Sequence, residues 1–258
     1  MGSKTVVMNP KPEATAEPPR SAKSNALGIQ SDSAFSEAAK RLCGRDLCSI
    51  GDLTVGEMAA IMELAHAVKS NPDDFRHSLD GRQMVLFFEK ASLRTRLTFE
   101  AAINTLGGNA IFVDQTQSPL GERESLPDMA HNIERWMSVI VLRTYSHDTI
   151  TEMAACSRIP VVNALSDLEH PCQAIADFFT LEERFGSAEG LRFTYVGDGN
   201  NVCHSLMLTA AQLGVHCTVA TPKGFAPKLE IIHKAIEISE QTGGSITLMQ
   251  DPVKAVTG

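Results

Sequence analysis

Apolar residues recur along the chain with two different periods, and the sequence switches between them repeatedly. Residues 53–68, "LTVGEMAAIMELAHAV", place apolar side chains at helical spacing, with Thr54 as the expected N-cap and Glu57 three residues later. "MVLFFE" (84–89) is a short continuous apolar run, typical of a strand that is buried on both faces. A helix is predicted to follow over about 92–106, because a glycine pair closes the periodic segment there.

The same alternation continues to the end of the chain. Further strands are predicted at 109–114, 138–144, 159–164, 191–196, 215–221 and 245–250, and further helices at 124–136, 147–157, 171–185, 202–214 and 228–243. Strands that alternate with helices indicate an α/β protein with parallel sheets. We expect two parallel-sheet α/β domains, residues 37–186 and 187–258, joined by the helix that Pro171 begins. The second domain is predicted to be Rossmann-like and incomplete at its C-terminus.

The first 36 residues have a different composition. They are rich in Pro, Ser, Ala and Lys and contain few large apolar residues. Such a segment cannot bury enough apolar surface to order itself, so residues 1–36 are predicted to form a disordered tail. The segment also lacks the apolar core of a secretory signal.

Composition excludes several classes of function. The chain has 258 residues, 43% of them hydrophobic, a net charge of −8 and a pI of about 5.5, which argues against nucleic-acid binding. No apolar run reaches the 18 or so residues of a membrane span, so a soluble protein with no membrane partner is expected. The six cysteines form no CxxC pair and show no zinc-ligand spacing, which predicts reduced thiols, a cytoplasmic location and no metal.

The stretch "FFEKASLRTRLTFEAA" (87–102) concentrates positive charge and hydroxyls where a strand meets a helix. The helix start offers unpaired backbone N–H groups, Ser92 and Thr95 add hydroxyl donors, and Arg94 can grip two phosphate oxygens. A cation in the first helical turn opposes the helix dipole unless an anion lies there. The stretch therefore points to a phosphate site, although an arginine pair at a helix start is more often a solvated surface.

Two further polar groups follow predicted strands. Arg143 ends one strand, and His170 and Gln173 flank Pro171 in "HPCQ", just after another. The carboxyl ends of parallel strands are where α/β proteins bind ligands. Taken singly, Arg143 reads as a surface arginine and His170 as a helix cap. Their occurrence at comparable strand ends favours a shared site.

The turn "YVGDGNNVCHS" begins the second unit and resembles a dinucleotide-binding turn only in part. Gly197-Asp198-Gly199 is followed by Asn200, Asn201 and Val202, with no third glycine at the spacing of GxGxxG, and the following strand ends in "VATPK" without a ribose-binding acid. Nicotinamide cofactors are therefore disfavoured. The paired asparagines suggest recognition of a small polar ligand such as a carboxylate or an amine.

These four stretches, in this order, resemble the aspartate/ornithine carbamoyltransferase family, from about Leu47 to the last residue. Within that family, "GDGNN" followed by "HS" is similar to the members that use ornithine. The resemblance implies transfer of the carbamoyl group of carbamoyl phosphate to the side-chain amine of L-ornithine, giving L-citrulline and phosphate in arginine metabolism. It implies no cofactor, a homotrimer, a carbamoyl-phosphate-binding domain at 37–186 and an ornithine-binding domain at 187–258.

The resemblance also assigns roles to individual residues. Ser92, Arg94 and Thr95 would bind the phosphate, with Leu93 contributing its backbone. Arg143 and His170 would polarise the carbamoyl oxygen as the catalytic pair, and Gln173 would hold the carbamoyl amide. Asn201 would contact the α-amino or α-carboxylate group of ornithine, and Arg96 would give structural support. Carbamoyl phosphate is a mixed anhydride, so its reaction needs oxyanion and leaving-group stabilisation rather than a metal.

The chain departs from the family pattern in two places. Pro119 precedes Leu120-Gly121 in the loop that reaches the neighbouring subunit's site, where many relatives have Gln or His. The family's Asp and Ser-Met-Gly segment for the ornithine side chain, and its Cys-Leu-Pro loop, do not occur in these 258 residues. We therefore expect this chain alone to bind carbamoyl phosphate, to be poorly soluble and to form no citrulline. We also expect the strand at 191–196 to have an unpaired edge.

Other functions stay open from sequence. A relative with another acceptor, such as putrescine or an acylated ornithine, would share the phosphate and carbamoyl motifs. A non-catalytic anion-binding relative would keep Ser92 and Arg94 without turnover. The direction of the pathway, arginine-making or arginine-degrading, is not set by these motifs.

Overall fold

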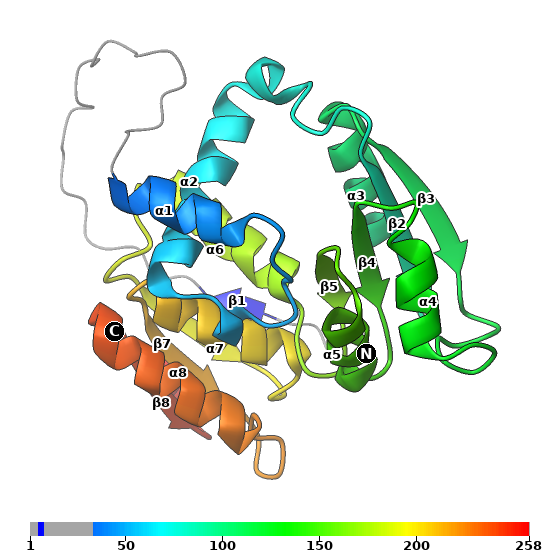
Figure 1. Ribbon diagram of the computed structural model, residues 1–258. Helices are drawn as coiled ribbons and strands as arrows, with labels where there is room; N and C mark the ends of the chain where they lie inside the picture. The colour runs from blue at the N-terminus through cyan, green and yellow to red at the C-terminus, as the bar shows by residue number, and fades with distance from the viewer. Residues whose placement is uncertain (1–4, 8–32, 258) are drawn as a thin grey trace.

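The computed structural model describes residues 5–7 and 33–257 of the chain. It contains two four-stranded sheets, which lie side by side in Figure 1 with several helices between and around them. The expected architecture of two parallel-sheet α/β units is confirmed.

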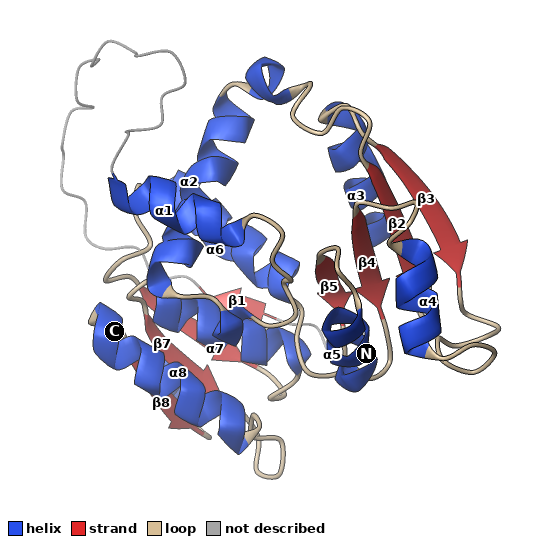
Figure 2. Cartoon of the chain, in the orientation of Figure 1, coloured by secondary structure: helices blue, strands red, loops and turns tan. Residues whose placement is uncertain are grey.

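The first sheet has the strand order β3-β2-β4-β5, and all its neighbours are parallel. Its strands are β2 (Gln83–Phe88), β3 (Asn109–Asp114), β4 (Val139–Arg143) and β5 (Val161–Leu165). The helices that follow the first three along the chain are α3 (Leu93–Thr105), α4 (Leu126–Ile133) and α5 (His147–Cys156). Figure 2 shows α4 and α5 in front of this sheet and α3 behind it.

Strand β2 is buried on both of its faces, as the continuous apolar run in its sequence predicts. Val85 and Phe87 belong to the core that α4 and α5 close, whereas Leu86 and Phe88 belong to the core on the side of α3. Successive strand residues point to opposite faces, so a strand covered by helices on both sides needs apolar residues throughout. The prediction that 84–89 is buried on both faces is confirmed.

The second sheet has the order β1-β6-β7-β8. Its strands are β1 (Thr5–Val7), β6 (Arg192–Val196), β7 (His216–Ala220) and β8 (Ser245–Met249). Its helices are α7 (Asn201–Gln212), α8 (Leu229–Thr242) and the short α9 (Pro252–Ala255). Strands β6, β7 and β8 are parallel, and β1 joins antiparallel to β6.

Strand β1 corrects two expectations. Thr5 pairs with Val196 and Val7 with Thr194, so the edge of β6 that was expected to be open carries a partner strand. The prediction of a disordered tail is wrong at Thr5–Val7, and wrong again from Ser33, where helix α1 (Ser33–Leu42) begins. The remaining tail positions, 1–4 and 8–32, lie outside the described residues.

The other elements connect the two sheets. They are η1 (Ile50–Asp52), α2 (Val55–Ser70), η2 (Pro72–Phe75) and α6 (Pro171–Phe185). The expected cap of α2 is confirmed: the Thr54 side chain accepts from the Glu57 backbone, and the Glu57 carboxylate accepts from the Thr54 backbone. Helix α6 runs from the carboxyl end of β5 to β6, as predicted, and ends at Gly186 in the left-handed conformation.

One large core spans more than the second sheet. Side chains of η1, α2 and α6, including Ile50, Met58 and Phe178, pack in the same cluster as those of β6, β7, α7 and α8. The segment before the first sheet therefore returns to support the second. The domain boundaries at 36 and 186 stay predictions, and the joining helix belongs to the shared core.

Candidate functional site

A cavity of about 730 Å³ opens at the carboxyl edge of the first sheet. Its walls come from the start of α3, the ends of β4 and β5, the start of α6 and the start of α7. Seven of the eight residues predicted for the site line it: Ser92, Arg94, Thr95, Arg143, His170, Gln173 and Asn201. Leu93, the eighth, does not line it and has a side chain that is 74% exposed. Segments more than 100 residues apart in sequence thus meet at one site.

The N-terminus of α3 forms the wall of the cavity at which an anion such as phosphate would bind. Ser92 occupies the N-cap with an extended backbone, but its side chain does not cap the helix and instead donates to the Thr95 hydroxyl at 2.9 Å. The first-turn N–H groups therefore keep their capacity to bind an anion. Arg94 is exposed beside them. Arg96 is turned elsewhere, since its guanidinium pairs with Glu100 at 2.8 Å and lies 3.8 Å from the centre of the Phe112 ring.

Arg143 ends β4 at a register irregularity and is only partly exposed. Its Nε is buried and, within the described part of the chain, has no hydrogen-bond partner and its guanidinium no ion pair. Burial lowers the pKa of Arg143. A cation that is partly desolvated without a counter-charge is costly unless a ligand supplies acceptors. Arg143 is therefore poised to bind an oxygen-rich ligand.

Glu89 lies at the end of the neighbouring strand and organises loops rather than neutralising Arg143. Its backbone N–H donates to the Arg143 carbonyl at 2.9 Å. Its buried carboxylate accepts from the backbone of Leu120 at 3.0 Å and of Tyr145 at 2.8 Å. The loop that contains Pro119 is thereby attached to the edge of the sheet at which the cavity opens.

The start of α6 carries the "HPCQ" group. His170 is the N-cap residue, Pro171 begins the helix, and the His170 backbone N–H donates to the Ser205 hydroxyl at 2.9 Å. Gln173 donates through Nε2 to the Asp177 carboxylate at 2.9 Å, one turn further along. Burial raises the pKa of Cys172 to about 11, so this thiol stays protonated near neutral pH and is a poor nucleophile.

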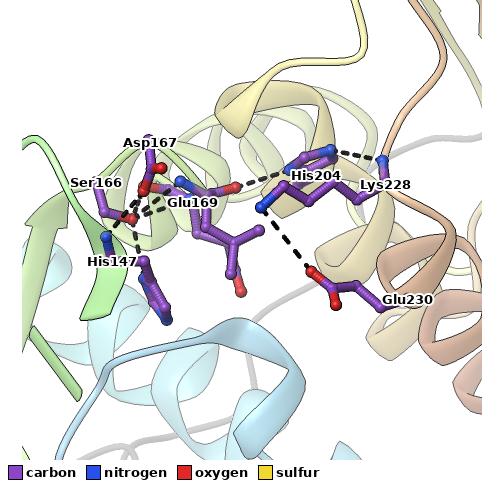
Figure 3. Close-up of polar contacts among 8 residues, drawn as sticks. His147, Ser166, Asp167, Glu169, His204, Lys228 and Glu230 are labelled. Atoms are coloured by element: carbon purple, nitrogen blue, oxygen red, sulfur yellow. Dashed lines mark hydrogen bonds and ion pairs between the residues drawn. The ribbon is translucent and has the colours of Figure 1, made fainter. Parts of the chain in front are cut away.

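The loop 166–169 before α6 is held by a dense set of polar contacts (Figure 3). The Ser166 hydroxyl accepts from the backbone of Leu168 and Glu169, each at 3.2 Å, and contacts His147 Nδ1 at 2.9 Å. His204 on α7 reaches the Leu168 carbonyl with Nδ1 at 2.8 Å and accepts from the Lys228 backbone with Nε2 at 3.1 Å. With one nitrogen donating and the other accepting, His204 is neutral, and burial lowers its pKa.

The Glu169 carboxylate joins this loop to two other segments. It is fully buried and accepts from the Ser49 hydroxyl, from the Ile50 backbone at 3.1 Å and from the Ser205 hydroxyl at 3.0 Å. Burial raises the pKa of Glu169, and the hydrogen bonds partly offset that shift. Because Ser205 also accepts from the His170 backbone N–H, α7 holds the backbone of the N-cap residue of α6.

The glycine and the two asparagines of the turn before α7 each have a different role in the structure. A Cβ on Gly199 would lie 2.2 Å from the Pro227 backbone nitrogen, so the close approach of the 226–227 loop requires glycine. Asn200 caps α7 by accepting from two backbone N–H groups, a structural role. Asn201 lines the cavity and donates to the Ser166 carbonyl at 2.6 Å. Only the second asparagine is thus placed for the ligand contact that the sequence suggested for the pair.

Sequence reasoning missed several residues of the site. Thr98, Leu165, Cys172, Ala176 and Val202 also line the cavity. A four-residue step from Gln173 to Asp177, one helical turn, was a usable signal for the hydrogen bond between them. Glu169 and Ser205 gave no local signal, because they meet only when the two sheets come together.

Two classes of site find no support in the described residues. No cluster of three or more His, Cys, Asp or Glu side chains is arranged to hold a metal ion. Over the same part of the chain, no helix combines the length and apolarity needed to cross a membrane. The described cysteines are all free thiols.

Comparison with known proteins agrees with this geometry. Residues 45–183 match the family "Aspartate/ornithine carbamoyltransferase, carbamoyl-P binding domain", and residues 189–258 match its "Asp/Orn binding domain". The chain is 46% identical over 210 residues to the ornithine carbamoyltransferase of Shewanella oneidensis, covering 81% of this chain and 69% of the relative.

Solved structures give the same result. The ornithine carbamoyltransferase of Pyrococcus furiosus has a TM-score of 0.81 at 39% identity, with 83% of this chain and 69% of that one covered. The enzyme of the same name from Thermus thermophilus has a TM-score of 0.73 at 40% identity, with 83% and 71% covered.

Proposed function

Because the chain belongs to the aspartate/ornithine carbamoyltransferase family, we propose that it transfers the carbamoyl group of carbamoyl phosphate to the side-chain amine of L-ornithine, giving L-citrulline and phosphate. The observation that carries the proposal is the meeting, in one cavity, of an uncapped helix N-terminus with Arg94, Arg143, His170 and Gln173. These groups complement the two halves of carbamoyl phosphate.

The phosphate half fits the start of α3. Ser92 and Thr95 supply hydroxyls, the first-turn backbone supplies N–H groups, and the exposed Arg94 supplies a bidentate cation. Leu93 takes part through its backbone N–H, in keeping with its exposed side chain. The same donors stabilise the charge that grows on the departing phosphate.

The carbamoyl half fits the opposite wall. When the neutral side-chain amine of ornithine attacks the carbamoyl carbon, a C–N bond forms and the C=O π electrons move to oxygen. Arg143 and His170 donate to that oxyanion, which is the step at which preorganised donors contribute most. The C–O bond to phosphate then breaks as the carbonyl re-forms, and the departing phosphate takes up the proton that the amine loses.

The acceptor would bind from the side of the second sheet. Asn201 Oδ1 already accepts from the Val202 backbone at 2.9 Å, and its second lone pair remains for the α-ammonium group of ornithine. Asn201 Nδ2 is used by Ser166, which fixes the orientation of the amide. Asn201 Oδ1 is therefore the atom that contacts the α-ammonium group of ornithine.

We further propose a homotrimer that acts in the cytoplasm, with citrulline formation serving arginine biosynthesis. Free thiols suit a reducing compartment. Leu93 and Leu97 expose 74% and 53% of their surface on α3 beside the cavity, which favours a covering neighbour. Light scattering should give three times the 27.9 kDa chain mass. A monomer that binds carbamoyl phosphate with full affinity would contradict the assembly.

Arg94→Ala tests the phosphate site. Loss of a charge-assisted contact with a dianion costs about 2–5 kcal/mol, so titration calorimetry with carbamoyl phosphate should show at least a roughly thirtyfold weaker Kd. Arg96→Ala is the control, because Arg96 pairs with Glu100 instead. Equal affinity of the Arg94→Ala variant and the unaltered chain would refute the assignment.

The acceptor class is tested with two bisubstrate analogues. The chain should bind δ-N-phosphonoacetyl-L-ornithine more tightly than N-phosphonoacetyl-L-aspartate, and the Asn201→Ala variant should lose affinity for the former. A colorimetric citrulline assay, with the Shewanella oneidensis relative as the positive control, separately tests the expectation from sequence that these 258 residues alone form no citrulline. Tighter binding of the aspartate analogue would refute the ornithine assignment.

A further inference from the structure

Asp177 is an acidic residue close to the site whose position has no purely structural explanation. It lies on α6, one turn after Gln173, and is only partly exposed. Among the described residues it forms no salt bridge, and its one hydrogen bond is from Gln173 Nε2 at 2.9 Å. A helix gains only about 0.2–0.5 kcal/mol from such an i,i+4 pair. This stabilisation is small for a carboxylate that burial has partly desolvated.

The hydrogen bond determines which way the Gln173 amide faces. An ionised carboxylate accepts hydrogen bonds and donates none, so the amide must turn its NH2 group toward Asp177. The carbonyl oxygen is then the group left over, and within the described chain it accepts no hydrogen bond. Without the carboxylate, the two orientations of the amide would differ little in energy, because oxygen and NH2 have nearly the same size.

The orientation matters because the cavity is rich in donors and poor in acceptors. Arg94 and Arg143 can only donate, and the start of α3 offers N–H groups. Carbamoyl phosphate needs donors around its phosphate and its carbonyl oxygen, but its NH2 group needs an acceptor. An amide oxygen at Gln173 meets that need, whereas an amide NH2 would face the ligand's NH2 and repel it.

We propose that Asp177 is a positioning residue that fixes the Gln173 amide with its oxygen available, so that the site selects a carbamoyl group over an acyl group that lacks the NH2. The inference rests on the proposed function, since it assumes that carbamoyl phosphate occupies this cavity. Asp177 does not touch the ligand. It acts on selectivity through Gln173 alone.

The test compares two stable analogues that differ in one group. Phosphonoacetamide carries the NH2 group, and 2-oxopropylphosphonate carries a methyl group in its place. Titration calorimetry on the 258-residue chain gives the ratio of their Kd values. Asp177→Leu should lower the preference for the amide about three- to tenfold, since the Gln173 side chain must then be immobilised at the time of binding. The affinity for the methyl analogue should not change, because that ligand makes no use of the amide.

Two further variants separate positioning from folding. Asp177→Asn keeps the shape and can pair with either amide orientation, so it should also lower the preference, by a smaller factor. In a Gln173→Ala background, Asp177→Leu should leave the preference unchanged, because the group that it positions is gone. Glu183, like Asp177, lies on α6, and its carboxylate pairs with Lys69 of α2, so Glu183→Gln removes a carboxylate from the same helix and should leave the preference unchanged.

The outcomes are distinguishable. Loss of affinity for both analogues by the same factor in Asp177→Leu and Asp177→Asn, with the ratio intact, would overturn the inference and leave the proposed function standing. Failure of the unaltered chain to bind either analogue would overturn the proposed function, and the inference with it. A ratio that falls in both Asp177 variants but not in Glu183→Gln supports the inference.

Discussion

Replacing Arg143 with Met should make the protein more stable while weakening its ligand binding. The Arg143 guanidinium is partly buried, has no counter-charge in the described chain, and its Nε has no hydrogen-bond partner. A buried donor without a partner costs about 1–3 kcal/mol, and Met offers a side chain of similar length with no donor. We therefore expect the free energy of unfolding of Arg143→Met to rise by roughly 1–2 kcal/mol.

The loss of affinity follows from the same geometry. A hydrogen bond from a charged donor contributes about 1.5–3 kcal/mol, so carbamoyl phosphate should bind Arg143→Met roughly ten- to hundredfold more weakly. A substitution that raises the free energy of unfolding but weakens ligand binding is typical of a position where the native residue serves binding at the expense of stability.

Urea denaturation followed by far-ultraviolet circular dichroism, without ligand, measures the first effect, and titration calorimetry measures the second. Arg192→Met is the matched control, because Arg192 is a strand arginine with an exposed side chain, and its stability should change by no more than about 0.5 kcal/mol. A less stable Arg143→Met variant would show that Arg143 holds the fold together, and the reasoning would be wrong.

The remaining predictions concern the loop 166–169. Burial lowers the pKa of His204, so the unfolded chain takes up its proton more readily; the stability from this group is present above about pH 6.5 and is lost as the pH falls below that value. His204→Gln should reduce this acid destabilisation in urea titrations from pH 7.5 to 5, and an unchanged pH dependence would contradict the assignment. Glu169→Ala should lower the free energy of unfolding by about 3 kcal/mol or more, because three donors lose their acceptor and each buried orphan costs about 1–3 kcal/mol. A loss below about 1 kcal/mol in the same denaturation assay would show that water replaces the carboxylate.

Local signals predicted the elements of the fold well. Thr54 and Glu57 predict a capping box, and Pro171 predicts the first turn of α6, because these residues act on backbone groups a few positions away. The strands of the first sheet were also readable, since burial on both faces leaves a continuous apolar run. What decided these elements lies within a few residues of each.

Long-range contacts were not readable. Strand β1 pairs with β6 across most of the chain, and the β-branched run Thr5–Val7 is too short to indicate by itself a strand or its partner. Glu169 looks like an ordinary loop acid in sequence, although it accepts from Ser49 and Ser205 in distant segments. The site residues that bind ligand were predicted from motif and resemblance, whereas those that hold them in place required the structure.

The pairing of β1 with β6 has a consequence for how the chain folds. Thr5 and Val196 are 191 residues apart, since 196 − 5 = 191. Contacts between such distant segments form late, because loop closure must be paid for before the pairing contributes. During synthesis the first residues leave the ribosome long before β6 has been synthesised, so the residues of β1 have no strand to pair with until then. Until it docks, one edge of the second sheet stays available to other strands, and the rate of that last step determines how long the protein is exposed to misassembly.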